Sequence, residues 1–221
     1  MYQERAAGLP HAIAWRSVTP PDGRVKRILP DGCMDLIWAD GQLIVAGPDT
    51  VAHLATPPAG SHSLALRFAA GSGPAVFGVP ADELTDRRIP LEELWPAPLV
   101  RRLAAVTSVD ELERVVRRRW APPDPAMVDV ARRARAGQPV DAIAVALGLS
   151  PRHLQRRVRA AFGYGPKMLA RILRLQRALG LARRGRPFAE VSVTAGYADQ
   201  AHLARDVKAL AGVPLGQLVP A

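Results

Sequence analysis

The sequence lacks several features that would assign it to common classes of protein. Its 221 residues contain one cysteine, Cys33, so no disulfide can form within the chain. No run of about 18 apolar residues is present, and the first residues lack the basic-then-apolar pattern of a secretory signal. We therefore expect a cytoplasmic protein with no membrane contact.

Motifs for catalysis and for metal binding are also scarce. There is no glycine-rich phosphate loop, no G-x-S-x-G elbow and no His-x-His pair followed by a glutamate. Asp31 and Asp35 come nearest to a catalytic carboxylate pair, but they are better explained as turn and strand-edge residues. His53 and His62 lie nine residues apart, which leaves a metal site across a hairpin as an alternative. We expect no enzyme activity, no cofactor and no metal.

The positive charge, in contrast, is plentiful and unevenly distributed. The net charge is +10 for the whole chain. Residues 1–95 carry 8 basic and 11 acidic side chains (net −3), residues 96–124 carry 6 and 4 (net +2), and residues 125–221 carry 16 and 5 (net +11). A basic segment beside a nearly neutral one is typical of a nucleic-acid-binding domain attached to another domain.

The first 95 residues show the pattern of short β-strands. Apolar runs such as "AIAW", "MDLIW" and "LALRF" are separated by "PPDG", "ADG" and "PPAGS", which are typical of turns. "MDLIWADGQLIVAG" predicts a hairpin about Asp40-Gly41. We expect a small cupin-like β-barrel or sandwich here and an α+β chain overall.

Helical spacing begins after Pro90. Apolar residues three and four apart predict two helices within residues 91–119, the second capped by Ser108 with Glu111 three residues later. "APPDP" then breaks the pattern. We therefore divide the chain into a β-rich sensor or ligand-binding domain (1–95), a helical linker with a candidate dimer surface (96–124) and a DNA-binding domain (125–221).

Residues 140–163 predict a helix-turn-helix. "VDAIAVALG" is apolar on one face and ends at Gly148, and Ser150-Pro151 begins a second helix. The second helix places Leu154 and Val158 on one face and arginines and a glutamine on the other. Arginine and glutamine are the side chains that recognise guanine and adenine edges in the major groove.

The same pattern returns after a long predicted helix (167–185). The turn glycine recurs at an offset of 48 residues (Gly148, Gly196), whereas the core leucine (Leu154, Leu203) recurs at 49. The second turn is therefore one residue longer. Two such units joined by one helix are a far more specific signal than one.

This arrangement resembles the DNA-binding domain of the AraC family of bacterial transcription regulators. The matching segments are "IAVALGLSPRHLQRRVRAAFGYGP" (143–166) and "GYADQAHLARDVKALAGVPLGQL" (196–218). The resemblance implies that two recognition helices enter successive major grooves of double-stranded DNA. Ser192, where a buried alanine is usual, and an early proline in "GVPLGQL" depart from the pattern. The expected DNA-binding residues are Arg152, His153, Gln155, Arg156, Arg159, Lys167, Gln200, His202 and Arg205.

The N-terminal segments "RILPDGCMDLIWADGQLIVAGPDT" (27–50), "LALRFAAGSG" (64–73) and "LTDRRIPLEELW" (84–95) are similar to the sensor half of a subset of AraC-type regulators. That resemblance implies control by a small-molecule effector, and Trp15, Trp38 and Cys33 are the candidate ligand-binding residues. Cys33 also has an alternative role as a redox sensor. A homodimer and contact with RNA polymerase remain open. Two rival functions are an enzyme or metal-binding β-barrel fused to a DNA-binding domain, and an architectural DNA binder without a signal.

Overall fold

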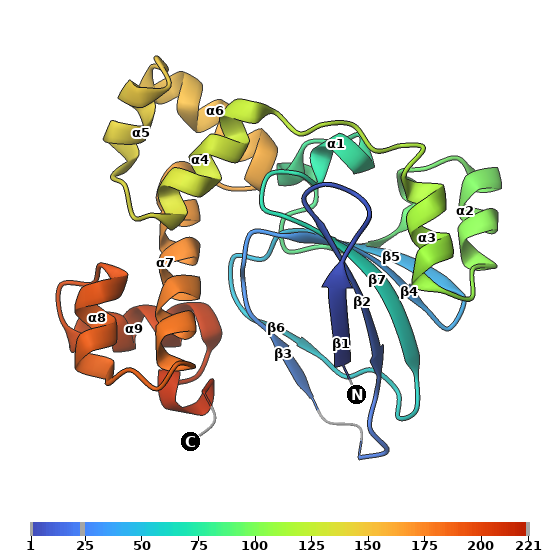
Figure 1. The fold of residues 1–221 in the computed structure, drawn as a ribbon, viewed down its shortest axis with the longest axis horizontal. Coiled ribbons are helices and arrows are strands. Elements are labelled where there is room, and N and C mark those ends of the chain that lie inside the picture. The colour runs from blue at the N-terminus through green and yellow to red at the C-terminus, as the bar shows by residue number, and fades with distance from the viewer. Residues whose placement is uncertain (1, 23–24, 220–221) are drawn as a thin grey trace.

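The computed structural model describes residues 2–22 and 25–219. Figure 1 shows two halves side by side, a sheet with its own short helices on the right and a set of helices on the left. Among the described helices, none has the length and apolar character that crossing a bilayer requires.

Eight strands occur in the described part of the first half. Six of them make one antiparallel sheet in the order β1-β2-β7-β4-β5-β8, and the other two, β3 and β6, form a separate antiparallel ribbon. The bounds are β1 Tyr2–Ala6, β2 Ala12–Val18, β3 Lys26–Ile28, β4 Met34–Ala39, β5 Gln42–Ala46, β6 His53–Ala55, β7 His62–Phe68 and β8 Arg88–Pro90.

The predicted hairpin is confirmed as β4 and β5. Ile37 pairs with Ile44, and Ala39 pairs with Gln42. Asp40 and Gly41 both have positive φ angles, of 47° and 84°, as the tightest hairpin turns require.

The sheet is open, because β1 and β8 stay at its two edges. The β3–β6 ribbon faces the sheet instead of joining it. Of the barrel and the sandwich that the strand pattern allowed, the arrangement of the described strands is therefore nearer to a sandwich with one small layer.

Short helices cover one face of the sheet: α1 Pro74–Phe77, α2 Ala97–Ala104 and α3 Val109–Val116, with 3-10 turns η1 Ala81–Glu83 and η2 Leu91–Glu93. Leu36 and Leu66 are directly paired on that face and are fully buried. They share one core with Leu103 and Leu112 from the helices. The helices predicted within 91–119 are thus packed on the sheet.

The N-terminus of α3 follows the predicted cap. The Ser108 hydroxyl accepts the Glu111 N–H at 3.3 Å. The Glu111 carboxylate accepts the Thr107 N–H at 2.9 Å, and the hydrogen bonds that the Thr107 N–H and hydroxyl donate to this carboxylate lower the pKa of Glu111.

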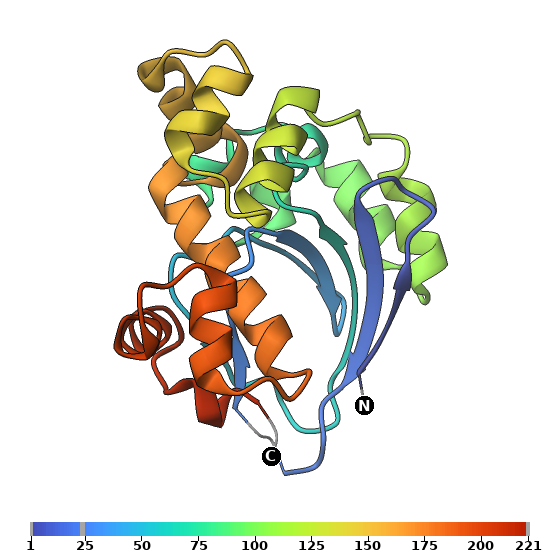
Figure 2. The ribbon, with the colours of Figure 1, turned by 60° about the vertical axis from the view of Figure 1, so that its left-hand side comes forward.

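The second half, described as far as residue 219, contains six α-helices: α4 Pro125–Arg135, α5 Val140–Ala146, α6 Pro151–Phe162, α7 Pro166–Ala182, α8 Phe188–Ala195 and α9 Gln200–Ala211. A last 3-10 turn, η3, spans Leu215–Gln217. Figure 2 shows α5–α6 and α8–α9 at opposite ends of α7. The first part of α7 contributes Ile172 to a core with α4–α6, and its second part contributes Leu179 to a core with α8 and α9.

Candidate nucleic-acid interface and effector cavity

In each helix-turn-helix unit, a glycine-containing turn sets the direction in which the second helix, α6 or α9, leaves the first. Gly148 and Gly196 have φ angles of 61° and 90°, in the left-handed region where glycine is favoured. One residue separates Gly148 from the cap of α6, and two separate Gly196 from the cap of α9. The predicted extra residue in the second turn is confirmed.

Both second helices begin at a side-chain cap. Ser150 accepts the His153 N–H at 3.3 Å, and Asp199 accepts the His202 N–H at 2.6 Å. Each cap satisfies one of the N–H groups that the first helical turn leaves unpaired. The start of each helix is therefore held in place by a residue that is not among the predicted DNA-binding residues.

The helix α6 has one buried and one exposed face. Leu154, Val158 and Phe162 are buried against α4, α5 and α7. The predicted DNA-binding residues of this helix are all exposed: Arg152, His153, Gln155, Arg156 and Arg159.

The helix α9 repeats the arrangement with fewer cations. Leu203 and Val207 are buried, whereas Gln200 and Arg205 are exposed. His202 is partly buried, and its Nδ1 accepts the Ala198 N–H at 3.3 Å.

The predicted residues on α6, α7 and α9 also differ in what they already contact. The His202 ring meets Tyr197 edge-on at 5.2 Å, so His202 helps to hold the turn. Arg159 Nε lies 3.2 Å from Asp82 Oδ2, on η1 of the sheet half. Arg156 and Lys167 are exposed and form no ion pair with any residue of 2–22 or 25–219. Sequence patterns could not reveal the Arg159 pair, because its partner is 77 residues away.

The C-terminal ends of both recognition helices touch the sheet half. At the end of α6, the Thr85 hydroxyl donates to the Gly163 carbonyl at 2.9 Å. At the end of α9, Arg27 Nη1 donates to the Ala211 carbonyl at 2.7 Å. Arg27 belongs to β3, so the ribbon that faces the sheet also touches the second unit.

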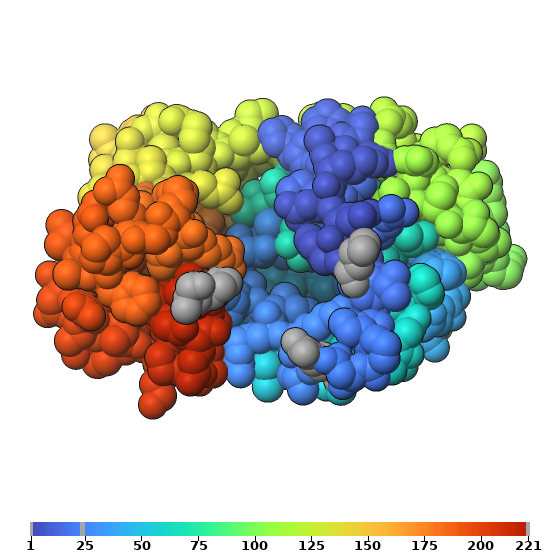
Figure 3. All heavy atoms as spheres, turned by 60° about the horizontal axis from the view of Figure 1, so that its bottom comes forward, coloured from blue at the N-terminus to red at the C-terminus, as the bar shows by residue number. Residues whose placement is uncertain are grey.

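A cavity of about 440 Å³ lies between the sheet and the ribbon. Figure 3 shows a hollow among the blue and teal residues of this half. Ile28 and Leu54 come from the ribbon, whereas Ile37 and Ile44 come from the sheet. A mostly apolar cavity with a few polar groups is the usual form of a small-molecule site.

Two ion-pair groups lie in the cavity wall. Arg67 Nε donates to the Asp35 carboxylate at 3.1 Å, and Trp15 Nε1 donates to the same carboxylate at 2.8 Å. Arg88 and Asp49 form a pair with two hydrogen bonds, the longer of 2.6 Å. Burial raises the pKa of Asp35, although Arg67 and the Trp15 N–H oppose the rise.

Cys33 also lines this cavity. Burial raises the pKa of its thiol well above the usual value, and Asp31 adds to the rise. A reactive cysteine needs a thiolate, so this environment disfavours a redox-sensing role and leaves Cys33 as a packing or ligand-contact residue.

The two candidate tryptophans lie on opposite faces of the sheet. Trp15 lines the cavity, whereas Trp38 donates to the Ala104 carbonyl at 2.9 Å on the helix-covered face. The histidines of the alternative metal site also line different hollows, His53 the cavity and His62 a hollow beside the α2–α3 connection at residues 104–107. No cluster of three or more candidate metal ligands occurs in the described part of the chain.

Comparison with protein families matches both halves. Residues 128–219 match a helix-turn-helix domain, and residues 11–90 match a domain of unknown function (DUF6597). A search of curated proteins found no match.

Solved structures share the fold over the whole length. ToxT from Vibrio cholerae is similar over 100% of this chain and 99% of its own, with a TM-score of 0.52 and 9% identity. ToxT bound to (E)-4-(8-methylnaphthalen-1-yl)but-3-enoic acid covers 99% of each chain at a TM-score of 0.51 and 10% identity. ToxT from Vibrio cholerae strain SCE256 with a bound unsaturated fatty acid is similar over 98% of this chain and 96% of its own. Its TM-score is 0.50 and its sequence identity is 9%.

These features define a DNA-binding transcription regulator with an N-terminal β-sheet domain and a C-terminal pair of helix-turn-helix units. The pair of helix-turn-helix units by which the sequence resembles the AraC-type regulators is thus present in the fold, and residues 128–219 match a helix-turn-helix family.

Proposed function

We propose that the chain regulates transcription by placing α6 and α9 in successive major grooves of one DNA duplex. The observation that carries this proposal is that the two helices are capped and packed alike and both present exposed Arg and Gln side chains. Base contacts would come from Arg152, Gln155, Arg156, Gln200 and Arg205, each good bidentate pair contributing about 1–3 kcal/mol of discrimination. His153, Arg159, Lys167 and His202 would contact phosphates or flank the base-reading residues.

Selection of bound fragments from a random DNA pool tests this proposal. Two short boxes about 10 bp apart are the expected result, because each helix occupies one turn of DNA. Enrichment of no sequence, with binding that disappears at moderate salt, would contradict it, because purely electrostatic binding is sequence-independent.

We further propose that the cavity binds an effector with an apolar body and one acidic group. Arg67 and Arg88 are already paired with carboxylates. Lys26, in the cavity wall, donates to the Ser17 hydroxyl at 3.0 Å and has no carboxylate partner among the described residues. The acids bound in the ToxT structures support this class of ligand by analogy of fold.

Tryptophan fluorescence can test the effector class, because Trp15 lines the cavity. A long-chain unsaturated fatty acid should change the emission and bind more tightly than the corresponding alcohol. Lys26→Ala should abolish that difference, whereas Lys208→Ala should preserve it, because Lys208 is an exposed residue of α9 that does not line the cavity. Equal binding of the acid and the alcohol by the wild type would contradict the proposal that Lys26 binds an acidic group of the effector.

The proposal assigns no catalysed reaction and no cofactor to the chain, and places it in the cytoplasm with the DNA. The domain division at 95/96 and 124/125, a homodimer and a contact with RNA polymerase stay predictions. Light scattering of the purified protein with and without DNA distinguishes one copy from two.

A further inference from the structure

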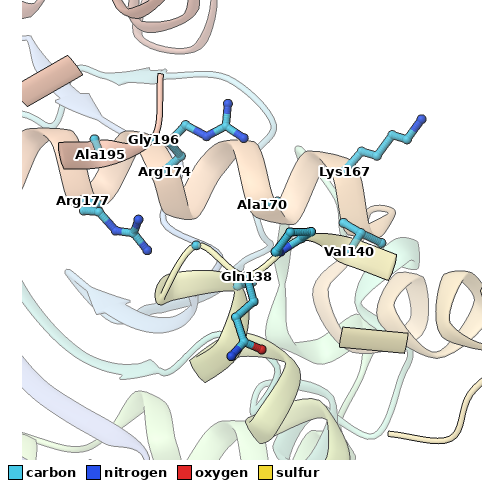
Figure 4. A pocket seen from close by; sticks show the side chains of 11 residues that line it. Gln138, Val140, Lys167, Ala170, Arg174, Arg177, Ala195 and Gly196 are labelled. Atoms are coloured by element: carbon cyan, nitrogen blue, oxygen red, sulfur yellow. The ribbon is translucent and has the colours of Figure 1, made fainter. Parts of the chain in front are cut away.

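A second basic surface lies between the two helix-turn-helix units and was not predicted as a whole from the sequence. It is a groove of about 370 Å³ bounded by the α4–α5 connection, by α7 and by the turn between α8 and α9. Figure 4 shows Lys167, Arg174 and Arg177 along α7, with Gly196 of the second turn beside Arg174. We call this surface the inter-unit groove.

The inter-unit groove contains cations without acids. Its lining residues, all from the described part of the chain, include no aspartate or glutamate. Lys167, Arg174 and Arg177 form no ion pair with any described residue, whereas Arg171 on the same helix pairs with Asp206. Three cations without acidic partners give the groove a positive potential, which favours an anion.

Two of these cations are held in position by uncharged partners. The Arg174 guanidinium lies over the Tyr197 ring at 5.3 Å from its centre, and Arg177 donates to the Arg135 carbonyl. Both contacts orient the side chain without neutralising it. The positive charge therefore stays available to an anion.

The groove also faces away from the sheet half. At 3.6 residues per turn, Lys167, Ala170, Arg174 and Arg177 fall on one side of α7. Gln176 lies on another side, where its amide donates to the Pro30 carbonyl at 2.7 Å. A long anion could thus enter the groove while the two halves remain in contact.

We propose that the inter-unit groove binds the phosphate backbone of DNA between the two boxes. This inference rests on the proposed function. A duplex whose successive major grooves are occupied by α6 and α9 must carry its backbone across the gap between the units, and α7 spans that gap. Lys167, Arg174 and Arg177 then act as positioning residues that set the register of the units on DNA without reading bases.

The salt dependence of binding is the first test. The slope of log K against log salt should fall by about 0.9 in magnitude for each phosphate contact that is lost. Arg174→Ala and Lys167→Ala should each show this decrease on the selected fragment and on an unrelated duplex. Arg183→Ala is the matched control, because Arg183 is an exposed cation at the C-cap of α7 and does not line the groove.

Neutral phosphates provide the second test. Methylphosphonates placed between the two boxes should weaken wild-type binding about tenfold, as loss of one or two charged hydrogen bonds would. The same substitution should have little further effect on the Arg174→Ala, Lys167→Ala double variant. Methylphosphonates outside the boxes should weaken both proteins alike.

The two proposals fail in different ways. If no boxes are selected, the proposed function is wrong, and the salt slopes on the unrelated duplex still decide whether the groove contacts phosphates. If boxes are selected but the groove variants keep the wild-type slope, the groove proposal alone is overturned. Arg177→Ala provides a second variant should Arg174→Ala disturb Tyr197, and unchanged thermal unfolding confirms that each variant is folded.

Discussion

The two helix-turn-helix units share their packing but not their surfaces. Each has a glycine turn, a capped second helix and a buried leucine at the same place, Leu154 in one and Leu203 in the other. The outer face of α6 carries three exposed arginines, whereas that of α9 carries only Arg205. Packing is what a repeated unit needs in order to fold, and the outer face is where the two copies can diverge.

The units also differ in what they touch at their far ends. The first meets η1 through Arg159 and Asp82, and the second meets the β3–β6 ribbon through Arg27. The ribbon is also one wall of the effector cavity. The ribbon therefore connects the effector cavity directly to the second unit.

The largest expected effect tests whether the two cores are equivalent. Leu154→Ala and Leu203→Ala should each lower the free energy of unfolding by about 2–5 kcal/mol, because each removes a buried side chain and leaves a cavity. Denaturant unfolding measures both. Val145→Ala is the control, since Val145 is 80% exposed and should change little. A small effect at Leu203 alone would show that the second core is the looser one.

The next effect tests whether base reading is shared equally. Arg156→Ala should weaken specific binding by about 1–3 kcal/mol and leave non-specific binding nearly unchanged, whereas Lys167→Ala should weaken both. We expect Arg205→Ala to cost less than Arg156→Ala, because the second helix carries less charge. Anisotropy titrations with selected and unrelated duplexes measure these differences. A larger loss at Arg205 would reverse the ranking of the units.

The caps should contribute equally to both units. Ser150→Ala and Asp199→Ala should each lower stability by about 1 kcal/mol, because each leaves an N–H of the first helical turn without its side-chain acceptor. Thermal unfolding detects a change of this size. Ser150→Asp should restore a capping acceptor, and failure of that variant to recover stability would argue against the cap.

The smallest expected effect concerns the contact between the halves. Asp82→Ala should release Arg159 and raise DNA affinity by no more than about fivefold, because partly exposed ion pairs contribute about 0.2–1 kcal/mol. Glu83→Ala removes the same charge from the neighbouring residue and is the control. Equal gains in both variants would show that only net charge matters.

The sequence by itself determined the local and repeated features of this protein. Ser150-Pro151, Gly148 and the apolar residues of α6 predicted a capped helix after a glycine turn, and the structure confirms it. Asp40-Gly41 predicted the β4–β5 hairpin in the same way. These features depend on residues close together along the chain, so periodicity, capping and turn chemistry reveal them.

Only the tertiary structure decided which distant residues meet. It placed Trp15 and Cys33 in one cavity and Trp38 on the opposite face, paired Arg159 with Asp82, and left Lys167, Arg174 and Arg177 without acids in one groove. The strand order also decided that the sheet stays open. Contacts of this kind depend on how strands and helices pack across long separations in sequence, which no local pattern of residues encodes.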